Sequence, residues 1–415
     1  MAKASIITIG DELLIGQVID TNSAWIAKEL NSIGIQVTRR VAVGDDWDEI
    51  WKALDEESLH ADIILITGGL GPTADDITKP LLCKYFNGKM IVDKKAFENV
   101  ENIFKNILKR PMIERNAKQA EVPDTCVVII NKRGTAPGMI FNKDSKIFIS
   151  MPGVPHEMKG MITDDVLPLL QKKYTTSAIV HRTLLTAGVG ESFLAELIKD
   201  FEEVLPKNIK LAYLPNYGMV RLRLTATGEE KEQTTIEVDQ QFDTLQKLVS
   251  KHLVTNEDEP LEKVVGKLLL AKKKTMCTAE SCTGGYIAHL LTSISGSSNF
   301  YEGSIVSYSY QAKENLLNVE RSTLEKNGAV SEEVVIEMVK GALQNIKADY
   351  SVAVSGIMGP SGGSTDKPVG TVWIAVGNKE KIETELFNFR FDRERNIQLT
   401  AVNALNLLRK FIIKN

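Results

Sequence analysis

Residues 275–291 read TMCTAESCTGGYIAHLL, and their order decides the fold of the region around them. The short apolar stretch TMCTAE is typical of a buried strand, and the apolar residues after Gly285 recur at helical spacing. Two glycines between them permit a tight turn. The rest of residues 256–415 continues this alternation of strand-like and helix-like stretches. Strands are expected at GSIVSYS, YSVAVSG and GTVWIAVG, and helices are expected from Pro260, near Gln311 and at the C-terminus. This alternation predicts an α/β domain with a parallel sheet.

The first 170 residues follow the same alternation of strand-like and helix-like stretches. SIITIG, IQVTRRVAV and DIILITGG are apolar enough for strands. TNSAWIAKELNSIG and DDWDEIWKALDEESL have helical periodicity, with Thr21 or Asn22 expected to cap the first helix. Repeated strand–helix units favour a doubly wound parallel sheet, in which ligands bind beyond the carboxyl ends of the strands.

The middle segment, 171–255, predicts a small α+β module. ESFLAELIKDFEEVL reads as one amphipathic helix, MVRLRLTATG as a half-buried strand and about 232–253 as another helix. A KH-like arrangement agrees with this order, but the segment has no GxxG to clamp a nucleic-acid backbone. A structural or dimerising role is favoured. The fold class expected is therefore α/β: two parallel-sheet domains, 1–170 and 256–415, joined by this module, in a homodimer.

Composition excludes several classes of protein. The formal net charge of -4 gives no general reason to bind nucleic acid or an anionic membrane. No apolar run approaches the roughly 20 residues that span a bilayer, and the first residues lack the pattern of a signal peptide. The four cysteines form no CxxC pair, and the five histidines show no zinc-ligand spacing. A cytoplasmic protein is expected.

Ser281 is the candidate nucleophile of the C-terminal domain. It lies at the turn between a strand and a helix, where N–H groups at the helix N-terminus can stabilise an anionic intermediate. Tyr308 and Lys313 follow the next strand, so a parallel sheet brings them to the same edge. A desolvated Lys can activate a Ser without a histidine. The structural alternative is an ordinary helix cap with a glycine turn, and Cys282 is the rival nucleophile.

A second serine–lysine pattern, Ser364 to Lys367, matches SxxK by sequence alone. That motif needs a helix to bring its two side chains together. Gly362 and Gly363 precede it and Pro368 follows, so the match is interpreted as accidental.

Several stretches of the C-terminal domain, in one order, resemble the CinA C-terminal (PncC-type) family. They are AESCTGG (279–285), GSSNFYEGSIVSYSYQAK (296–313), GAVSEEVV (328–335) and SGIMGPSGGSTDKPVGTVW (355–373). The resemblance implies hydrolysis of the carboxamide of nicotinamide mononucleotide (NMN) without a cofactor, with Ser281 as nucleophile and Lys313 and Tyr308 as its partners. Tyr310 stands where the family usually has an Asn, which bears on substrate affinity. Substrate-binding positions carried over are Thr283, Gly284, Gly285, Ser331, Ser355, Gly356, Gly359, Gly362 and Gly363.

The N-terminal domain carries two polar stretches at expected strand ends, TGGLGPTADD (67–76) and GDELLIGQVIDTN (10–22). Glycine N–H groups suit phosphate, and carboxylates such as Asp75 and Asp76 suit a divalent metal. A polar turn and a helix cap are the alternative reading of either stretch alone. Neither stretch is a Walker A loop.

With NAKQA (116–120), RGTAPGM (133–139) and MPGVPHEM (151–158), these stretches resemble the molybdopterin-binding fold of MoaB/MogA-type proteins, in its CinA N-terminal version. The resemblance implies a metal-dependent ADP-ribose pyrophosphatase. Its diphosphate ligand is expected near Gly68, Gly69, Gly71, Thr73 and Asn22, and its divalent metal near Asp75, Asp76 and Glu12. The leading hypothesis is a bifunctional enzyme of pyridine-nucleotide salvage acting on NMN and ADP-ribose, with no membrane or direct nucleic-acid partner. The alternatives are a molybdopterin-binding protein and a competence-associated interaction protein.

Overall fold

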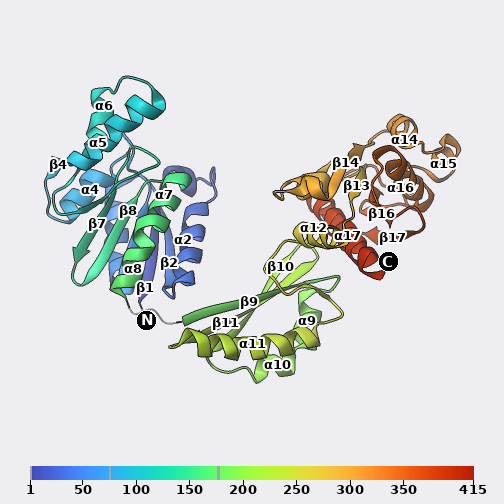
Figure 1. Ribbon diagram of the computed structural model, residues 1–415, viewed down its shortest axis with the longest axis horizontal. Helices are drawn as coiled ribbons and strands as arrows, with labels where there is room; N and C mark the ends of the chain where they lie inside the picture. The colour runs from blue at the N-terminus through green and yellow to red at the C-terminus, as the bar shows by residue number, and fades with distance from the viewer. Residues whose placement is uncertain (1, 74–75, 175–177) are drawn as a thin grey trace. The chain divides into compact units, whose positions relative to one another are not determined.

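The computed structural model describes residues 2–73, 76–174 and 178–415 (Figure 1). By their internal contacts these residues divide into two compact units. One unit holds the chain up to Val180 together with Ala226–Ile236, and the other holds His181–Thr225 with Glu237–Asn415. No helix in the described ranges combines the length and apolar character that a membrane span requires.

A six-stranded sheet forms the centre of the N-terminal unit. Its strands are β1 (Lys3–Ile9), β2 (Gln36–Val43), β3 (Ile63–Thr67), β6 (Val127–Ile129), β7 (Gly138–Lys143) and β8 (Lys146–Met151). They follow the order β2-β1-β3-β8-β7-β6; the first four are parallel, and β7 and β6 are antiparallel to their neighbours. The chain passes from β2 on one side of β1 to β3 on the other. The topological switch point, where ligands bind in such sheets, therefore lies beyond the carboxyl ends of β1 and β3.

Helices cover both faces of this sheet because its central strands are apolar on both sides. α2 (Thr21–Ser32), α7 (Pro155–Met161), η3 (Ile162–Val166) and α8 (Leu167–Lys173) pack on one face, and α3 (Trp47–His60) and α4 (Thr78–Tyr85) pack on the other. Ile6 belongs to the first core cluster and Ile7 to the second, as alternation along a strand requires. Asp20 caps α2 by accepting from Ser23 N at 2.9 Å, so the prediction of Thr21 or Asn22 as cap was wrong by one or two residues.

A smaller excursion of the N-terminal unit contains one antiparallel strand pair and short helices. Its elements are β4 (Met90–Val92), α5 (Lys94–Asn102), η1 (Ile103–Leu108), α6 (Glu114–Ala117), η2 (Lys118–Ala120) and β5 (Glu121–Pro123). α1 (Asp11–Leu14) follows β1 directly. The excursion brings Gln119 beside the switch point, where its Nε2 donates to Leu70 O at 3.4 Å.

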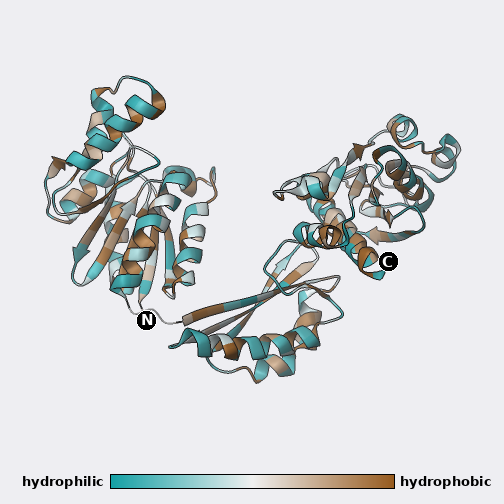
Figure 2. Cartoon of the chain, viewed as in Figure 1, coloured by the Kyte–Doolittle hydropathy of each residue, from teal (hydrophilic) through white to brown (hydrophobic). Residues whose placement is uncertain are grey.

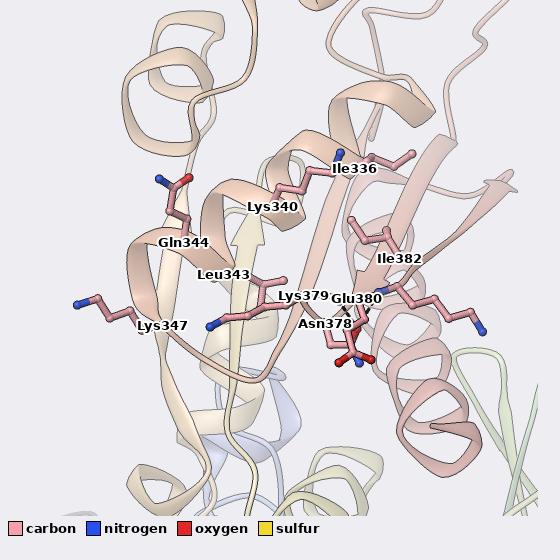
Figure 3. Close-up of a pocket in the computed structure, with 10 residues that line it drawn as sticks. Ile336, Lys340, Leu343, Gln344, Lys347, Asn378, Lys379, Glu380 and Ile382 are labelled. Atoms are coloured by element: carbon pink, nitrogen blue, oxygen red, sulfur yellow. Dashed lines mark hydrogen bonds between the residues drawn. The ribbon is translucent and has the colours of Figure 1, made fainter.

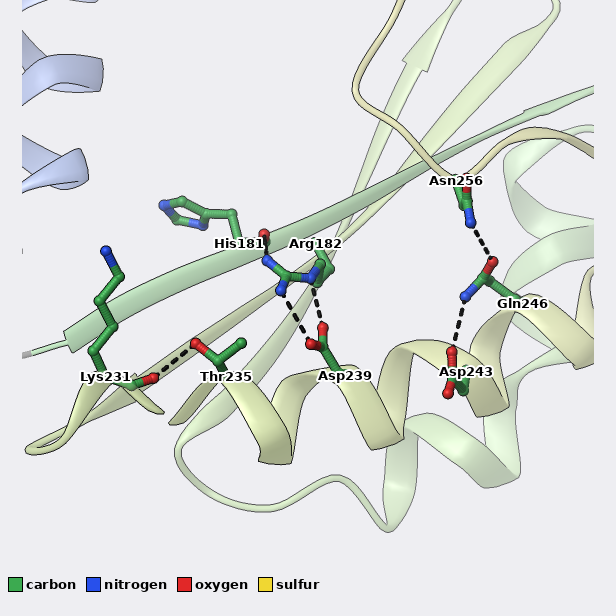
Figure 4. Close-up of polar contacts among 8 residues, drawn as sticks. All are labelled: His181, Arg182, Lys231, Thr235, Asp239, Asp243, Gln246 and Asn256. Carbon is green, nitrogen blue, oxygen red and sulfur yellow. Dashed lines mark hydrogen bonds and ion pairs between the residues drawn. The ribbon is translucent and has the colours of Figure 1, made fainter. Parts of the chain in front are cut away.

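The middle module is a four-stranded sheet with helices. Its elements are β9 (Ala178–Ala187), α9 (Glu191–Leu197), α10 (Lys199–Glu203), β10 (Ile209–Asn216), β11 (Met219–Gly228), α11 (Lys231–Leu248) and β12 (Leu253–Thr255), with strand order β10-β11-β9-β12. Arg182 on β9 forms a two-pronged ion pair with Asp239 on α11, with N–O distances of 2.6 and 3.1 Å (Figure 4). This pair fastens the helix to the sheet.

Two expectations for the middle module were wrong. The single helix expected over 191–205 is two helices that meet at Ile198, which is buried while Phe193 and Val204 are exposed. The helix expected to reach about 253 ends at Leu248, and the chain then adds β12 to the sheet beside β9. No glycine occurs where the two helices meet.

The C-terminal domain contains a five-stranded mixed sheet. Its strands are β13 (Met276–Glu280), β14 (Tyr301–Val306), β15 (Tyr350–Gly356), β16 (Thr371–Gly377) and β17 (Ile382–Asn388), in the order β14-β13-β15-β16-β17. β14, β13 and β15 are parallel, whereas β16 and β17 are antiparallel. The parallel α/β core agrees with the sequence-based expectation; β17 was missed. The switch point lies beyond β13 and β15, so the residues after Glu280 and Gly356 share one edge.

Two layers of helices enclose this sheet. α12 (Leu261–Lys272), α13 (Tyr286–Thr292) and α17 (Arg393–Lys414) cover one face, and α14 (Tyr310–Leu317), α15 (Arg321–Asn327) and α16 (Glu332–Ile346) cover the other, with the short η4 (Ser297–Asn299) before β14. The sheet presents alanines such as Ala279, Ala353 and Ala375 to α16. Figure 2 shows the helices carrying both hydrophobic and hydrophilic residues, as expected of helices that cover a sheet.

Candidate active site

The turn after β13 holds Ser281 in a fixed position at the edge of the sheet. Its backbone N–H donates to Val354 O on β15 at 3.1 Å, so the residue is still attached to the neighbouring strand. The side chain is buried, with 7% of the residue exposed. Gly285, at φ 98°, adopts the left-handed backbone that ends the turn and starts α13.

A buried carboxylate, Glu280, organises this turn. One of its oxygens accepts from Thr283 Oγ1 at 2.6 Å, Gly285 N at 3.1 Å and Ile287 N at 3.0 Å, and the other accepts from Ala288 N at 2.8 Å. Glu280 is fully buried, and these donors together with the helix N-terminus replace water around its charge. The expectation that the first N–H groups of α13 are free for an oxyanion was therefore wrong. The N–H groups of Cys282 and Thr283 take no part in this cap and lie on the turn itself.

Lys313 comes from α14 and reaches Ser281 through the interior. Its Nζ donates to Ser281 Oγ at 2.8 Å and to Ser307 O at 2.6 Å, with a longer contact of 3.5 Å to Tyr308 O. The residue has no exposed surface. Ser309 begins α14 as its cap, accepting from Ala312 N at 3.1 Å, which directs the first turn of the helix toward the site.

Burial changes the acid–base properties of this pair. Desolvation lowers the pKa of Lys313 to about 8, although the neighbouring Cys282 opposes the shift. The other two partners of Nζ are backbone carbonyls, which can only accept hydrogen bonds. Once Lys313 loses its proton, Ser281 Oγ is the partner among these three that can donate to the nitrogen lone pair. The arrangement is suited to remove the proton of Ser281.

Cys282 is packed into the domain core. It belongs to the cluster that includes Ile287 and Leu291, and only 5% of it is exposed. Burial raises the pKa of its thiol to about 12. A thiol needs to ionise in order to attack, so this environment disfavours Cys282 as the nucleophile.

Tyr308 is placed differently from Lys313. Its side chain is 65% exposed, and its hydroxyl accepts a hydrogen bond from Arg393 Nη2 at 3.2 Å. Arg393, the first residue of α17, also donates through Nη1 to Gly359 O at 2.8 Å. The structure thus brings Ser281 and Lys313 together and joins the hydroxyl of Tyr308 to Arg393 at the surface nearby. Sequence reasoning missed Glu280 and Arg393.

The loops after β15 and before α16 form the far side of this edge. Ser355 Oγ donates to Ala329 O at 2.7 Å, Ser331 Oγ donates to Gly328 O at 2.9 Å, and Tyr310 OH accepts from Ala329 N at 3.2 Å. The glycines proposed for substrate binding on these loops follow Ser355, at Gly356, Gly359, Gly362 and Gly363. These bonds fix the backbone of the loops and engage the serine hydroxyls.

Lys367 belongs to these loops and not to a second serine–lysine site. Its Nζ donates to Asn327 O at 2.6 Å and to Val330 O at 2.7 Å. Ser364 instead contacts the backbone of Lys367: its Oγ accepts from Lys367 N at 3.1 Å, and its backbone N–H donates to Lys367 O at 2.9 Å. Residues 364–367 therefore form a turn, and their match to SxxK does not mark a serine–lysine pair.

A separate cavity of about 420 Å³ lies at the switch point of the N-terminal unit. Gly68, Gly69 and Gly71, the positions where a diphosphate ligand is expected, line it. Gly68 has φ 118°, and a Cβ there would lie 2.2 Å from Ile9 O, so the loop approaches β1 more closely than any other residue allows.

Asp76 closes this glycine loop. Its carboxylate accepts from Gly71 N and Thr73 N, both at 2.8 Å, and from the Thr73 hydroxyl. Asn22 donates to Gly153 O at 2.7 Å and lines an adjoining cavity, where its buried Oδ1 lacks a partner among the described residues. Asp75 lies outside the described residues.

Carboxylate side chains line the cavity at the switch point, and they bear on whether it could hold a divalent cation. Its lining includes the carboxylates of Glu12, Asp45, Asp76 and Glu157. The described residues contain no cluster of three or more groups placed to bind a metal together. Mg²⁺ typically uses one or two carboxylates plus phosphates of the substrate, and the donor set agrees with that mode.

Lys79 is a buried cationic side chain of the N-terminal unit that the sequence analysis missed, as it missed Arg393 in the C-terminal domain. It lies on α4, it is buried, and its Nζ donates to Gln119 O at 2.7 Å. Burial lowers its pKa to about 8, while Glu121 and Asp76 oppose the shift.

Three domain families match this chain in sequence. Residues 5–172 match a probable molybdopterin binding domain, residues 181–254 the KH domain of damage-inducible protein CinA, and residues 258–412 the CinA C-terminal domain. Fold and matches together define the class: a three-domain α/β protein with a molybdopterin-binding-type domain, a KH module and a CinA-type domain.

Relatives match over almost the whole chain. A CinA-like protein of Flavobacterium psychrophilum is 47% identical over 414 residues, covering 100% of this chain and 99% of its own length. A putative competence-damage inducible protein of Clostridium beijerinckii is 40% identical, covering 99% and 100%. A solved CinA superfamily protein from Klebsiella pneumoniae is 35% identical and covers 38% of this chain and 100% of its own, with a TM-score of 0.37. The chain belongs to the CinA family.

Proposed function

We propose that this protein is a bifunctional hydrolase of pyridine nucleotides. Its C-terminal domain hydrolyses the carboxamide of NMN to nicotinate mononucleotide and ammonia, and its N-terminal domain hydrolyses the diphosphate of ADP-ribose with a divalent metal. The observation that carries the first activity is the buried contact of 2.8 Å between Lys313 Nζ and Ser281 Oγ.

The first chemical step uses neutral Lys313 as the base. Lys313 Nζ takes the hydroxyl proton while Ser281 Oγ forms a bond to the carboxamide carbon, and the carbonyl oxygen becomes an oxyanion. The N–H groups of Cys282 and Thr283, on the turn, are the donors available to that oxyanion. Lys313 then returns the proton to the nitrogen as the C–N bond breaks, and ammonia leaves.

The second step removes the acyl group. Lys313, neutral again, takes a proton from water as the water oxygen bonds to the acyl carbon, and the same proton returns to Ser281 Oγ when the ester bond breaks. Glu280 acts indirectly, because its hydrogen bonds with the Thr283 hydroxyl and with backbone N–H groups from Gly285 to Ala288 hold the turn that carries Ser281 and the oxyanion donors.

Arg393 and Tyr308 supply the group expected to recognise a mononucleotide. The guanidinium of Arg393 can bind a phosphate in two-pronged fashion and is held in place by Gly359 O and the hydroxyl of Tyr308. Tyr308 then acts by positioning Arg393 and by contact with substrate.

In the N-terminal domain, Glu12 and Asp76 would hold the cation together with the diphosphate. When bound, the cation would neutralise phosphate charge and polarise a phosphoryl oxygen. The glycine loop would offer the N–H group of Gly69 to phosphate, because the N–H group of Gly68 donates to Met151 O at 3.1 Å.

The full-length chain tests both activities. Incubation with NMN is expected to release ammonia and nicotinate mononucleotide in equal amounts, and incubation with ADP-ribose and Mg²⁺ is expected to give AMP and ribose 5-phosphate. Ser281→Ala should stop the first reaction and leave the second unchanged. If the folded wild-type chain releases no ammonia from NMN, the deamidase proposal is wrong.

A second candidate function, molybdopterin binding, is favoured by the family match of residues 5–172. Titration of the purified chain with molybdopterin and with ADP-ribose separates the two. Saturable molybdopterin binding that ADP-ribose does not displace, with no diphosphate hydrolysis, would favour the second candidate.

A further inference from the structure

A cavity of about 770 Å³ lies between the C-terminal half of α16 and the turn that joins β16 to β17 (Figure 3). Its apolar lining comes from Ile336 and Leu343 on α16 and from Ile382 at the start of β17. This volume is in the range of sites for small molecules.

The cavity is separate from the candidate active site. β16 pairs with β15 so that Val372 lies opposite Gly356 and Gly377 lies opposite Ser351. Gly377 therefore marks the amino end of β15, whereas Ser281 and the loops around it lie at the carboxyl ends of β13 and β15. The cavity follows Gly377, at the other end of the sheet.

Lysines dominate the charge of this cavity. Lys340 lies on α16, Lys347 follows the last residue of that helix, and Lys379 comes from the turn. In the part of the chain that the structure describes, the ammonium groups of these three make no hydrogen bond or ion pair with protein atoms. Lys381 is paired with Glu383 at 2.7 Å, and Glu380 is the one carboxylate among the lining residues. The cavity lining thus combines apolar side chains with lysines from two elements, and in Figure 3 the side chain of Lys347 extends away from the turn.

The helix dipole accounts for part of this arrangement only. Cations near the last turn of a helix are stabilised by its C-terminal carbonyls, which explains a lysine at Lys347. Lys379 lies on a different element, and in Figure 3 its side chain extends toward α16 below Leu343. Its placement brings positive charge from the turn to the same cavity.

The turn that carries Lys379 is rigid. Asn378 Oδ1 accepts from Glu380 N at 2.9 Å and from Lys381 N at 2.8 Å, and Asn378 N donates to Lys381 O at 2.9 Å. Leu343, on the opposite wall, is almost fully buried in the domain core. Both walls are therefore formed before any ligand binds, which reduces the entropic cost of binding.

We propose that this cavity binds a nucleoside monophosphate, with the base on Ile336, Leu343 and Ile382 and the phosphate between Lys340 on α16 and Lys379 on the turn. Inorganic phosphate alone would make no contact with the apolar side chains of the cavity, and an uncharged nucleoside would leave the ammonium groups without an anionic partner. The ligand class that satisfies both parts joins a flat, largely apolar ring to a phosphate.

Photolabelling of the full-length chain with 8-azido-AMP tests this proposal. After irradiation and peptide mapping, we expect labelled residues within 336–347 or 378–382. AMP should suppress this label, and adenosine or inorganic phosphate at the same concentration should suppress it far less. Higher salt should weaken labelling, because lysine–phosphate contacts near the surface are screened.

Paired variants complete the test. Lys340→Gln with Lys379→Gln should reduce labelling at these peptides roughly tenfold. Lys326→Gln with Lys410→Gln, which changes two exposed lysines of the same domain, should leave it unchanged. No label at these peptides in the wild-type chain would overturn the proposal. Labelling that survives the first pair, or that phosphate suppresses as well as AMP does, would also overturn it.

Discussion

Lys313 Nζ and Ser281 Oγ lie 2.8 Å apart in a buried contact between residues 32 positions apart in the chain. β13 and β14 are parallel neighbours, so the segments that follow them begin at the same edge of the sheet. Ser281 is the first residue after β13, and Lys313 follows β14 on the first turn of α14. The fold therefore creates a serine–lysine pair without a histidine.

The pH dependence of NMN hydrolysis should report the pKa of Lys313. Its base form is neutral, and burial lowers the pKa from the usual 10.5 to about 8. We expect kcat/KM to rise with pH, to change about tenfold per unit below pH 8 and to level off above it. A rate that is flat between pH 6 and 8 would contradict the role of Lys313 as base.

Replacing the buried lysine by an apolar side chain of similar length should stabilise the protein while removing activity. The lowered pKa corresponds to a cost of about 3 kcal/mol for keeping Lys313 charged at pH 7, at about 1.36 kcal/mol per unit. Lost hydrogen bonds to Ser281 and Ser307 offset part of this gain. Because the folded pKa is below the unfolded one, wild-type stability should rise with pH between about 8 and 10.5.

Denaturant unfolding of Lys313→Met at pH 7 and pH 10 measures both effects. The free energy of unfolding should exceed that of wild type by about 1 kcal/mol at pH 7, and the difference should shrink at pH 10. A variant less stable than wild type at pH 7 would mean that the charged lysine stabilises the fold.

Ser281 and Cys282 are adjacent but should respond differently to substitution. Ser281→Ala is expected to lose several orders of magnitude in the rate of ammonia release, on the scale known for catalytic serines. Cys282→Ser should keep most activity, because the thiol is buried and burial raises its pKa to about 12. An active Ser281→Ala together with an inactive but folded Cys282→Ser would assign the attack to the thiol.

Glu280→Gln should damage both stability and catalysis. An amide cannot accept all the hydrogen bonds that the carboxylate receives from Thr283, Gly285, Ile287 and Ala288, and each bond to a charged group contributes about 1.5–3 kcal/mol. We expect a loss of about 3 kcal/mol or more in the free energy of unfolding, and a lower kcat in the molecules that remain folded. Glu333→Gln, an exposed change in the first turn of α16, serves as control. An unchanged melting temperature for Glu280→Gln would contradict the capping role.

Functional residues of a parallel sheet follow the carboxyl ends of its strands, and this rule explains which parts of the site the sequence could predict. Ser281 and Lys313 follow adjacent parallel strands, and glycine-rich loops follow β3 and β15, so alternation alone places them at two edges. Arg393 could not be predicted, because its partners Gly359 and Tyr308 are 34 and 85 residues away and no local pattern joins them. β17 was missed because it is an edge strand whose residues are mostly half-buried or exposed. The amphipathic pattern over 191–205 continues across Ile198 and therefore conceals the break between α9 and α10.

Metal dependence should divide the two proposed activities. Glu12 lines the cavity of the N-terminal unit, whereas Ser281 and Lys313 offer no typical ligands for a hard cation. Chelation with EDTA should stop ADP-ribose hydrolysis and spare ammonia release from NMN.

Glu12→Gln should lower ADP-ribose hydrolysis at least tenfold, raise the Mg²⁺ concentration needed for half-maximal rate and leave NMN hydrolysis within about twofold. Asp165→Asn, an exposed acidic position outside the cavity lining, is the matched control and should change neither rate. Glu12 is a more informative position than Asp76, whose carboxylate also closes the glycine loop through Gly71 and Thr73. If EDTA stops both reactions, or if Glu12→Gln changes the rate without changing the Mg²⁺ requirement, the proposed cation role of this cavity is wrong.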